Sequence, residues 1–165
     1  MRAIKARQLS PEAFRISGRY QDLYDIEAMR RGPPGDSGFD PDLVVMNLGG
    51  ATLPAACVAR VRKMPRNIVS GLEYHRYTAG GLLPLDGDCL IFVGRARKGF
   101  DPDRLEAFVV PKGVFVKLNP GVVHGTQFPV RDEWVRVLVI LPEHTYDNDI
   151  VRKPLAPGEA VEVLS

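Results

Sequence analysis

The feature that most limits the fold of this chain is a series of short β-type runs separated by turn residues. The runs are rich in Val, Ile, Leu and aromatic residues, and Gly, Pro, Asn or Asp stands between nearly all of them. This pattern predicts strands at 43–48, 56–61, 68–75, 81–85, 89–93, 107–110, 114–118 and 134–141. Many short antiparallel strands form a sandwich or a closed barrel, and closure removes exposed sheet edges. We therefore predict an all-β fold.

One or two short helices are expected beside the strands. Ser10-Pro11-Glu12 offers an N-cap, a proline at the first helical position and an acidic first turn, so a short helix is predicted that stops at Gly18. Residues 101–105 predict one capped helical turn. The two ends of the chain, 3–9 and 161–164, are predicted as edge strands.

Size and charge restrict the class of protein. A chain of 165 residues can bury a core without disulfide or metal support, and we expect a single domain spanning 1–165. The net charge of +2 gives no strong field to attract nucleic acid or a membrane surface, so neither is expected as a partner. Arg60, Arg62, Lys63 and Arg66 cluster without interleaved aromatic residues, which is typical of a solvated face.

Cysteine usage and the N-terminus indicate the compartment. Cys57 and Cys89 each lie inside an apolar run and are expected to be buried free thiols. Residues 1–7 lack the apolar core of a signal peptide, and no stretch reaches the roughly 18 apolar residues that span a bilayer. We expect a cytoplasmic protein.

A carboxylate and an imidazole two residues apart mark the candidate site. Glu73 and His75 point to the same face of a regular strand, together with Tyr77. An inward polar face of this kind is costly unless its groups are paired or coordinated. A second imidazole, His124, follows the turn Asn119-Pro120-Gly121 and is predicted to begin a new strand, from which it can reach the mouth of a barrel.

These three side chains offer two nitrogens and one oxygen as ligands. That donor set suits a divalent transition metal such as Zn, Ni, Mn or Fe(II), which can hold an α-hydroxy acid and polarise it. Arg76 and Lys117 are candidates for binding a substrate carboxylate. Tyr77 and Gln127 are further candidate substrate contacts.

Simpler roles stand beside these hypotheses. A histidine at a strand end is more often a hydrogen-bonded structural residue than a ligand, so a structural role for His75 stays open. His144 lies past the last long strand and is assigned to the loop surface. Trp134 and Phe128 are assigned to the core rather than to a substrate platform.

Motifs in a fixed order also indicate a family. They are Leu9-Ser10-Pro11-Glu12-Ala13-Phe14, Leu72-Glu73-Tyr74-His75, Leu83-Pro84-Leu85-Asp86-Gly87, Leu105-Glu106-Ala107-Phe108-Val109 and Pro120-Gly121-Val122-Val123-His124. Over most of its length the chain resembles the ureidoglycolate lyase (formerly hydrolase) family of the cupin superfamily. The resemblance implies a double-stranded β-helix barrel, commonly a homodimer, that splits ureidoglycolate into glyoxylate and urea in purine breakdown.

The resemblance also implies roles for residues. The family pattern puts the metal ligands and the catalytic groups on Glu73, His75 and His124, with Ni, Zn or Mn gripping the hydroxy acid while a base takes its hydroxyl proton. Gly80 stands where family members carry Gln, and the residues on either side of His124 differ from the family's Trp and His. These departures favour a second hypothesis, a non-catalytic cupin that binds a small acid or a sugar derivative.

Overall fold

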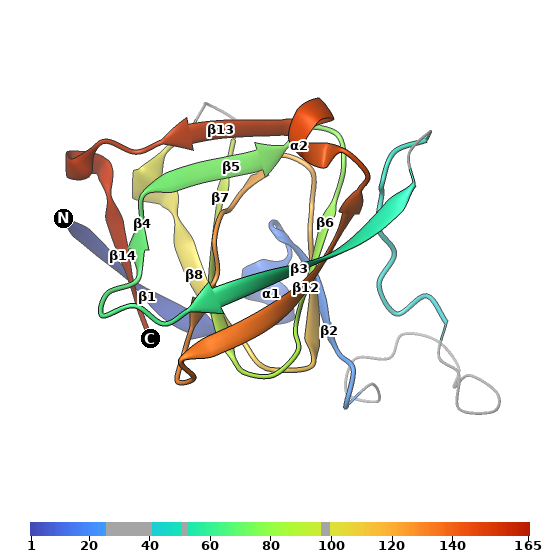
Figure 1. Cartoon of the computed structure of the whole chain (residues 1–165), viewed down its shortest axis with the longest axis horizontal. Coiled ribbons are helices and arrows are strands. Elements are labelled where there is room, and N and C mark those ends of the chain that lie inside the picture. Colours follow the sequence, from blue (N-terminus) through green and yellow to red (C-terminus); the bar gives the residue numbers. More distant parts are fainter. Residues whose placement is uncertain (26–40, 51–52, 97–99) are drawn as a thin grey trace.

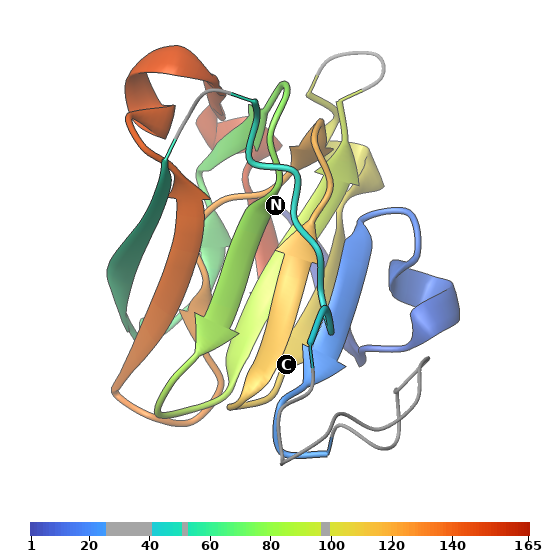
Figure 2. The same ribbon diagram turned by 90° about the vertical axis from the view of Figure 1, so that its right-hand side faces the viewer.

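Two β-sheets packed face to face form the body of the molecule (Figures 1 and 2). The computed structural model describes residues 1–25, 41–50, 53–96 and 100–165. The larger sheet has the order β10 (Val122–Val123), β7 (Cys89–Arg95), β8 (Glu106–Val110), β1 (Arg2–Gln8), β14 (Val161–Leu164) and β4 (Ile68–Val69), with β11 (Phe128–Pro129) also paired to β7. The second sheet has the order β2 (Gly18–Asp22), β9 (Val114–Leu118), β6 (Gly80–Pro84), β12 (Trp134–Pro142) and β3 (Pro54–Arg62).

A third, two-stranded sheet lies over one side of the larger one. It pairs β13 (Ile150–Pro154) with β5 (Gly71–His75). The helices are short: α1 (Pro11–Phe14), α2 (Thr145–Asn148) and the 3-10 turns η3 (Pro102–Arg104) and η4 (Pro157–Glu159). No helix in the described ranges is long and apolar enough to cross a membrane. The prediction of an all-β fold with short helices is confirmed.

The core has two clusters, one on each face of β7. Ile91 and Val93 belong to the cluster between the two large sheets, where Phe14 of α1 meets Phe108 edge-on at a centroid distance of 5.3 Å. Phe92 belongs to the second cluster, which lies between the larger sheet and Leu72 of β5. Because a strand buried on both faces needs apolar residues throughout, β7 reads as a continuous hydrophobic run in the sequence.

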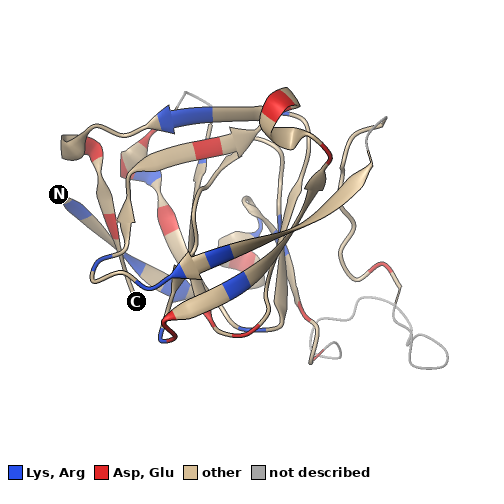
Figure 3. Cartoon of the chain, in the orientation of Figure 1, with Lys and Arg blue, Asp and Glu red and all other residues tan. Residues whose placement is uncertain are grey.

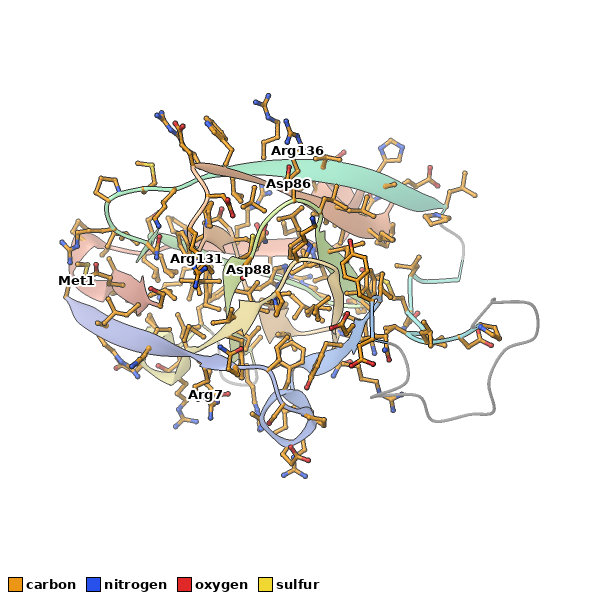
Figure 4. The ribbon with its side chains drawn as sticks, turned by 90° about the horizontal axis from the view of Figure 1, so that it is seen from below. Met1, Arg7, Asp86, Asp88, Arg131 and Arg136 are labelled. Atoms are coloured by element: carbon orange, nitrogen blue, oxygen red, sulfur yellow. The ribbon has the colours of Figure 1, made fainter. Side chains whose placement is uncertain are left out.

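The turn after β6 is held by a charged pair. The Asp86 carboxylate accepts a hydrogen bond from the Arg136 backbone N–H at 2.7 Å and another from its guanidinium at 2.6 Å (Figure 4). These bonds, the backbone bond first, lower the pKa of Asp86. The backbone N–H of Leu85 also donates to the carbonyl of Arg136 at 2.8 Å, so this turn is fixed to the neighbouring strand β12.

Several expectations about strands are wrong. Residues 43–48 form no strand but pass over β6, where Asn47 accepts a hydrogen bond from Ala79 N at 2.7 Å. The run 68–75 breaks at Ser70 into β4 and β5, which belong to different sheets. Neither end of the chain is an edge strand, because β1 pairs in parallel with both β8 and β14, and β14 also pairs with β4.

Burial departs from expectation at β3 and β12. Trp134 is 45% exposed because it lies on the outer face, where the guanidinium carbons of Arg60 and Arg62 approach its ring centroid to 5.5 and 5.4 Å. Cys57 is exposed because β3 is the last strand of its sheet. Cys89 is fully buried as predicted, and burial raises the pKa of its thiol to about 12. Phe128 is buried, also as predicted.

Candidate functional site

Three polar side chains form a row across neighbouring strands. Glu73 of β5 lies opposite Arg152 of β13, and on its other side it forms a β-bridge with His124. Two backbone hydrogen bonds, of 2.9 and 2.8 Å, join Glu73 and His124 directly. Because directly opposed residues share one face of a sheet, the three side chains point the same way. Arg152 Nε lies 3.1 Å from Glu73 Oε2, and His124 Nε2 lies 4.0 Å from Glu73 Oε1.

His75 lies two residues further along β5 on the same face. The rings of His75 and His124 are 5.2 Å apart between centroids. His75 is only 3% exposed, and its Nδ1 has no hydrogen-bond partner within the described part of the chain. Burial, with the nearby His124 as the second cause, lowers the pKa of His75 to about 4, so its imidazole is neutral near neutral pH.

The tautomer of His124 follows from its hydrogen bond. Nδ1 lies 2.9 Å from the carbonyl oxygen of Val122, which can only accept, so Nδ1 carries the proton. Burial lowers the pKa of His124 as well. The Nε2 atom therefore keeps its lone pair, on the side that faces Glu73.

A cavity of about 370 Å³ lies beside this row. Small-molecule sites in proteins have volumes of about 300 to 1,000 Å³, so the cavity suits a small ligand. Its walls carry charged groups and hydroxyls as well as apolar side chains, among them Ser70, Leu72, Glu73, Phe92, Thr126 and Arg152.

The described residues do not form a three-ligand metal centre. No group of three His, Cys, Asp or Glu side chains in these ranges is placed to hold an ion. Glu73 shares its carboxylate between Arg152 and the neighbouring His124, while the free Nδ1 of His75 is buried apart. Two imidazoles and a carboxylate are suitable donors for a transition metal, but as arranged they do not fit the three-ligand site that the sequence predicts.

Of the predicted site residues, only Glu73 lines the cavity. Tyr77 lies beyond the end of β5, where the strand period no longer applies, and is 70% exposed. Arg76 is exposed beside it. Lys117 lies on β9 in the other large sheet, opposite Arg19. Gln127 turns back to donate to the carbonyl of Gly125 at 2.9 Å. The structure thus brings together Glu73, His75 and His124, the three that the sequence places first.

The sequence did not point to two residues at this site, Arg152 and Asp149. The Asp149 carboxylate accepts hydrogen bonds from the backbone N–H groups of Arg76, Tyr77 and Thr78 at 2.9 to 3.1 Å, and from the Thr78 hydroxyl at 2.5 Å. It therefore fixes the chain immediately after His75. The only signal for Arg152 is a brief β-type run, Ile150–Pro154, that ends in proline.

Comparison with known proteins identifies the fold. A dTDP sugar isomerase from Desulfovibrio desulfuricans G20 superposes with a TM-score of 0.54, covering 86% of this chain and 87% of that one at 14% identity. This chain has the cupin fold. The predicted double-stranded β-helix is confirmed at that level, and the low identity shows the fold alone.

Other solved structures match more weakly. RmlC from Streptococcus suis, in complex with dTDP-D-xylose, has a TM-score of 0.42 at 16% identity over 55% of this chain and 44% of its own. Bacillus subtilis oxalate decarboxylase, described with Mn(II) centres, has a TM-score of 0.45 at 15% identity over 64% of this chain and 24% of its own. The chain thus spans less than half the length of either protein. No protein-family model and no curated relative matches the sequence.

Proposed function

We propose that this cupin binds a small hydroxy acid beside the row of Arg152, Glu73 and His124, and cleaves it as ureidoglycolate lyases do. The observation that carries the proposal is the contiguous row itself: Arg152 and Glu73 line a small cavity, and the neutral imidazole of His124, which does not itself line the cavity, turns its Nε2 toward Glu73. A base and an anion-binding group at one place are what cleavage of a hydroxy acid requires.

The substrate carboxylate binds the guanidinium of Arg152. Glu73 engages the Nε of this group, and guanidinium has five N–H donors, so the terminal nitrogens are available for a bidentate contact. The fork geometry orients the hydroxyl-bearing carbon. Lys153 also lines the cavity, with its ammonium paired to Glu159 at 3.3 Å.

His124 moves the proton. Nε2 takes the proton from the substrate hydroxyl, the C–O double bond forms, and the bond from that carbon to the urea nitrogen breaks. The imidazolium then returns the proton to the departing nitrogen, which gives glyoxylate and urea with no oxidant or reductant. The Glu73 carboxylate, 4.0 Å from Nε2, stabilises the transient positive charge.

The test is glyoxylate release from ureidoglycolate by the purified chain. His124→Gln should lose turnover by about 10²-fold or more, the usual contribution of a positioned base. The matched control is His144→Gln, because His144 is an exposed histidine whose side chain is 71% accessible. Arg152→Lys should raise KM more than it lowers kcat, because a point charge replaces a fork. Equal turnover by His124→Gln and the unaltered chain would refute the assignment.

The proposed steps need no metal, but a divalent transition metal, Ni, Zn or Mn, is tested in the same assay. No step above runs through an ion, since the described ligands do not converge on one. The assay is therefore run with chelator and with each metal in turn. Metal-dependent turnover would show that the ligands rearrange around an ion.

Binding without catalysis is the second candidate. It is favoured by the ion pair of Arg152 with Glu73. The pair partly neutralises the Glu73 carboxylate before any ligand binds, which weakens the support that this carboxylate gives to a charged His124 during catalysis. The ligand in this case is a small acid or a sugar derivative. Thermal stabilisation by such a ligand, with no product formed, would support this candidate, since binding to the native state raises stability by mass action.

A further inference from the structure

The guanidinium of Arg152 has a second partner, the aromatic ring of Tyr146. Its central carbon lies over that ring, 4.7 Å from the centroid, while its Nε lies 3.1 Å from Glu73 Oε2. Tyr146 belongs to α2, which stands at the start of β13, where basic residues lie beside an acidic one on β5 (Figure 3). The cation in the cavity wall is thus held on its face by a ring and at one nitrogen by a carboxylate.

The backbone that carries Tyr146 is fixed, although the side chain itself is 59% exposed. The hydroxyl of Thr145, the first residue of α2, is buried and donates to the carbonyl of Pro142 at 2.8 Å. Asp149 N donates to Thr145 O at 3.0 Å, and the Asp149 carboxylate binds the segment that follows His75. Helix α2 is therefore tied to both β12 and β5, so the ring of Tyr146 offers Arg152 a surface in a fixed place.

Stacking on a ring restricts a guanidinium without using its hydrogen-bond donors. Contact across the face of Tyr146 leaves every N–H in the plane, and Glu73 takes only the one at Nε. The Arg152 side chain is 56% exposed and has high rotamer entropy, so in the absence of the ring it would sample many orientations. The ring therefore holds one orientation of the terminal nitrogens, the pair that a carboxylate can bind bidentately.

We propose that Tyr146 is a positioning residue for anion binding, whose ring fixes the plane in which Arg152 presents its terminal nitrogens to a ligand carboxylate. The inference rests on the proposed function in one respect, that Arg152 binds this carboxylate. Tyr146 does not line the cavity, so its effect on a ligand passes through Arg152.

Trp134 offers a contact of the same kind at a different place. Its ring meets the guanidinium carbons of Arg60 and Arg62 at 5.5 and 5.4 Å, on the outer face of β12. Neither of these arginines lines the cavity, whereas Arg152 does. Loss of the Trp134 ring therefore shows what the removal of an exposed aromatic–arginine contact does away from the site.

The first test is NMR titration with glycolate, a small 2-hydroxy acid, as the probe. Tyr146→Leu keeps an apolar side chain suited to a helix but has no aromatic face, and it should raise the Kd about two- to fivefold. This change equals about 0.4 to 1 kcal/mol at about 1.4 kcal/mol per factor of ten, the size of an exposed cation–π contact. Tyr146→Phe restores the face and should bind glycolate as the unaltered chain does. Trp134→Leu is the matched control and should leave the Kd unchanged.

The second test measures the coupling between Tyr146 and Arg152. Lysine has no planar fork to orient, so in an Arg152→Lys background Tyr146→Leu should change the Kd by less than about 1.5-fold. Equal weakening by Tyr146→Leu in both backgrounds would assign the ring a structural role and overturn the inference. An unchanged Kd for Tyr146→Leu in the otherwise unaltered chain would overturn it as well.

Turnover separates this inference from the proposed reaction, because glycolate has no urea group to lose. Glycolate binding that depends on Tyr146, with no glyoxylate released from ureidoglycolate, would refute the lyase and support the positioning role. Glyoxylate release with the same KM in Tyr146→Leu and the unaltered chain would refute the positioning role and leave the lyase standing. No binding of glycolate by the unaltered chain would overturn the anion site at Arg152 and the role of Tyr146 together.

Discussion

Replacing Asp149 with alanine should destabilise the protein more than any other change at the candidate site. The carboxylate is 8% exposed and accepts four hydrogen bonds from the segment Arg76 to Thr78. Only the Arg76 N–H has a second acceptor, the backbone oxygen of Asp149 at 3.2 Å, and that bond survives the substitution. The segment would lose its anchor immediately after His75.

The magnitude follows from which donors water can reach. Arg76 and Tyr77 are exposed, so water can replace the carboxylate at their N–H groups. Thr78 is 7% exposed, and both its N–H and its hydroxyl would be left buried without an acceptor. Each unsatisfied buried group costs about 1 to 3 kcal/mol, so with two such groups Asp149→Ala should lower the free energy of unfolding by about 2 to 6 kcal/mol. Asp149→Asn, which keeps one oxygen, should lose about half of that.

Urea unfolding followed by circular dichroism measures the effect. With a urea slope of about 2 kcal/mol/M, the midpoint for Asp149→Ala should fall by about 1 to 3 M. Asp147→Ala is the matched control, because Asp147 is an exposed aspartate on α2 and should change stability by about 0.5 kcal/mol at most. A loss below about 1 kcal/mol for Asp149→Ala would show that the carboxylate does not anchor the segment.

Further predictions concern pH and local backbone structure. Burial lowers the pKa of His75 to about 4, so between pH 6.5 and 4 the unfolded chain binds a proton that the folded chain does not. As the pH falls from 6.5 to 4, the free energy of unfolding should therefore decrease by up to about 3 kcal/mol. Urea unfolding at pH 6.5 and at pH 4 measures this decrease, which should be smaller by that amount in His75→Gln. Gly113→Ala should lower stability by at least about 1 kcal/mol in thermal unfolding, because φ is +82° and the new Cβ would meet the ring of Tyr24. Ser10→Ala should lower it by about 1 kcal/mol in the same assay, because Ser10 Oγ accepts from Ala13 N at 3.1 Å at the start of α1.

Local patterns in the sequence predict most of the strands but not their partners. Residues 114–118 form β9 as predicted, because alternating apolar side chains and flanking turn residues specify a strand locally. The same information cannot place β1 between β8 and β14, since parallel pairing joins segments far apart in the chain. It also predicts a strand at 43–48, where apolar residues instead pack over β6 as a covering segment.

For the candidate site too, the sequence predicted local features but not contacts between distant segments. The strand period alone places Glu73 and His75 on one face, and the structure does so. The strand period could not predict how deeply Glu73 and His75 are buried, because their burial depends on which other segments of the chain cover that face of the strand. Arg152 pairs with Glu73 only because β13 returns beside β5, and no local pattern indicates that return. The sequence consequently offered Arg76 and Lys117 as anion-binding groups, neither of which lines the cavity.

Gly80 and the unpartnered nitrogen of His75 are two aspects of one feature. A Cβ at Gly80 would lie 3.9 Å from His75 Cδ2 and 3.5 Å from Leu141 Cδ2, which is ordinary contact, so a side chain can start there and run beside the imidazole. A longer side chain ending in an amide could hydrogen-bond a ring nitrogen from this position, whereas glycine cannot. With glycine, Nδ1 of His75 has no such neighbour, and burial dominates its pKa. His124, in contrast, has its tautomer fixed by Val122 and a carboxylate 4.0 Å from its Nε2. Glycine at position 80 therefore leaves His75 without a side-chain partner, and the proposed proton transfer is assigned to His124.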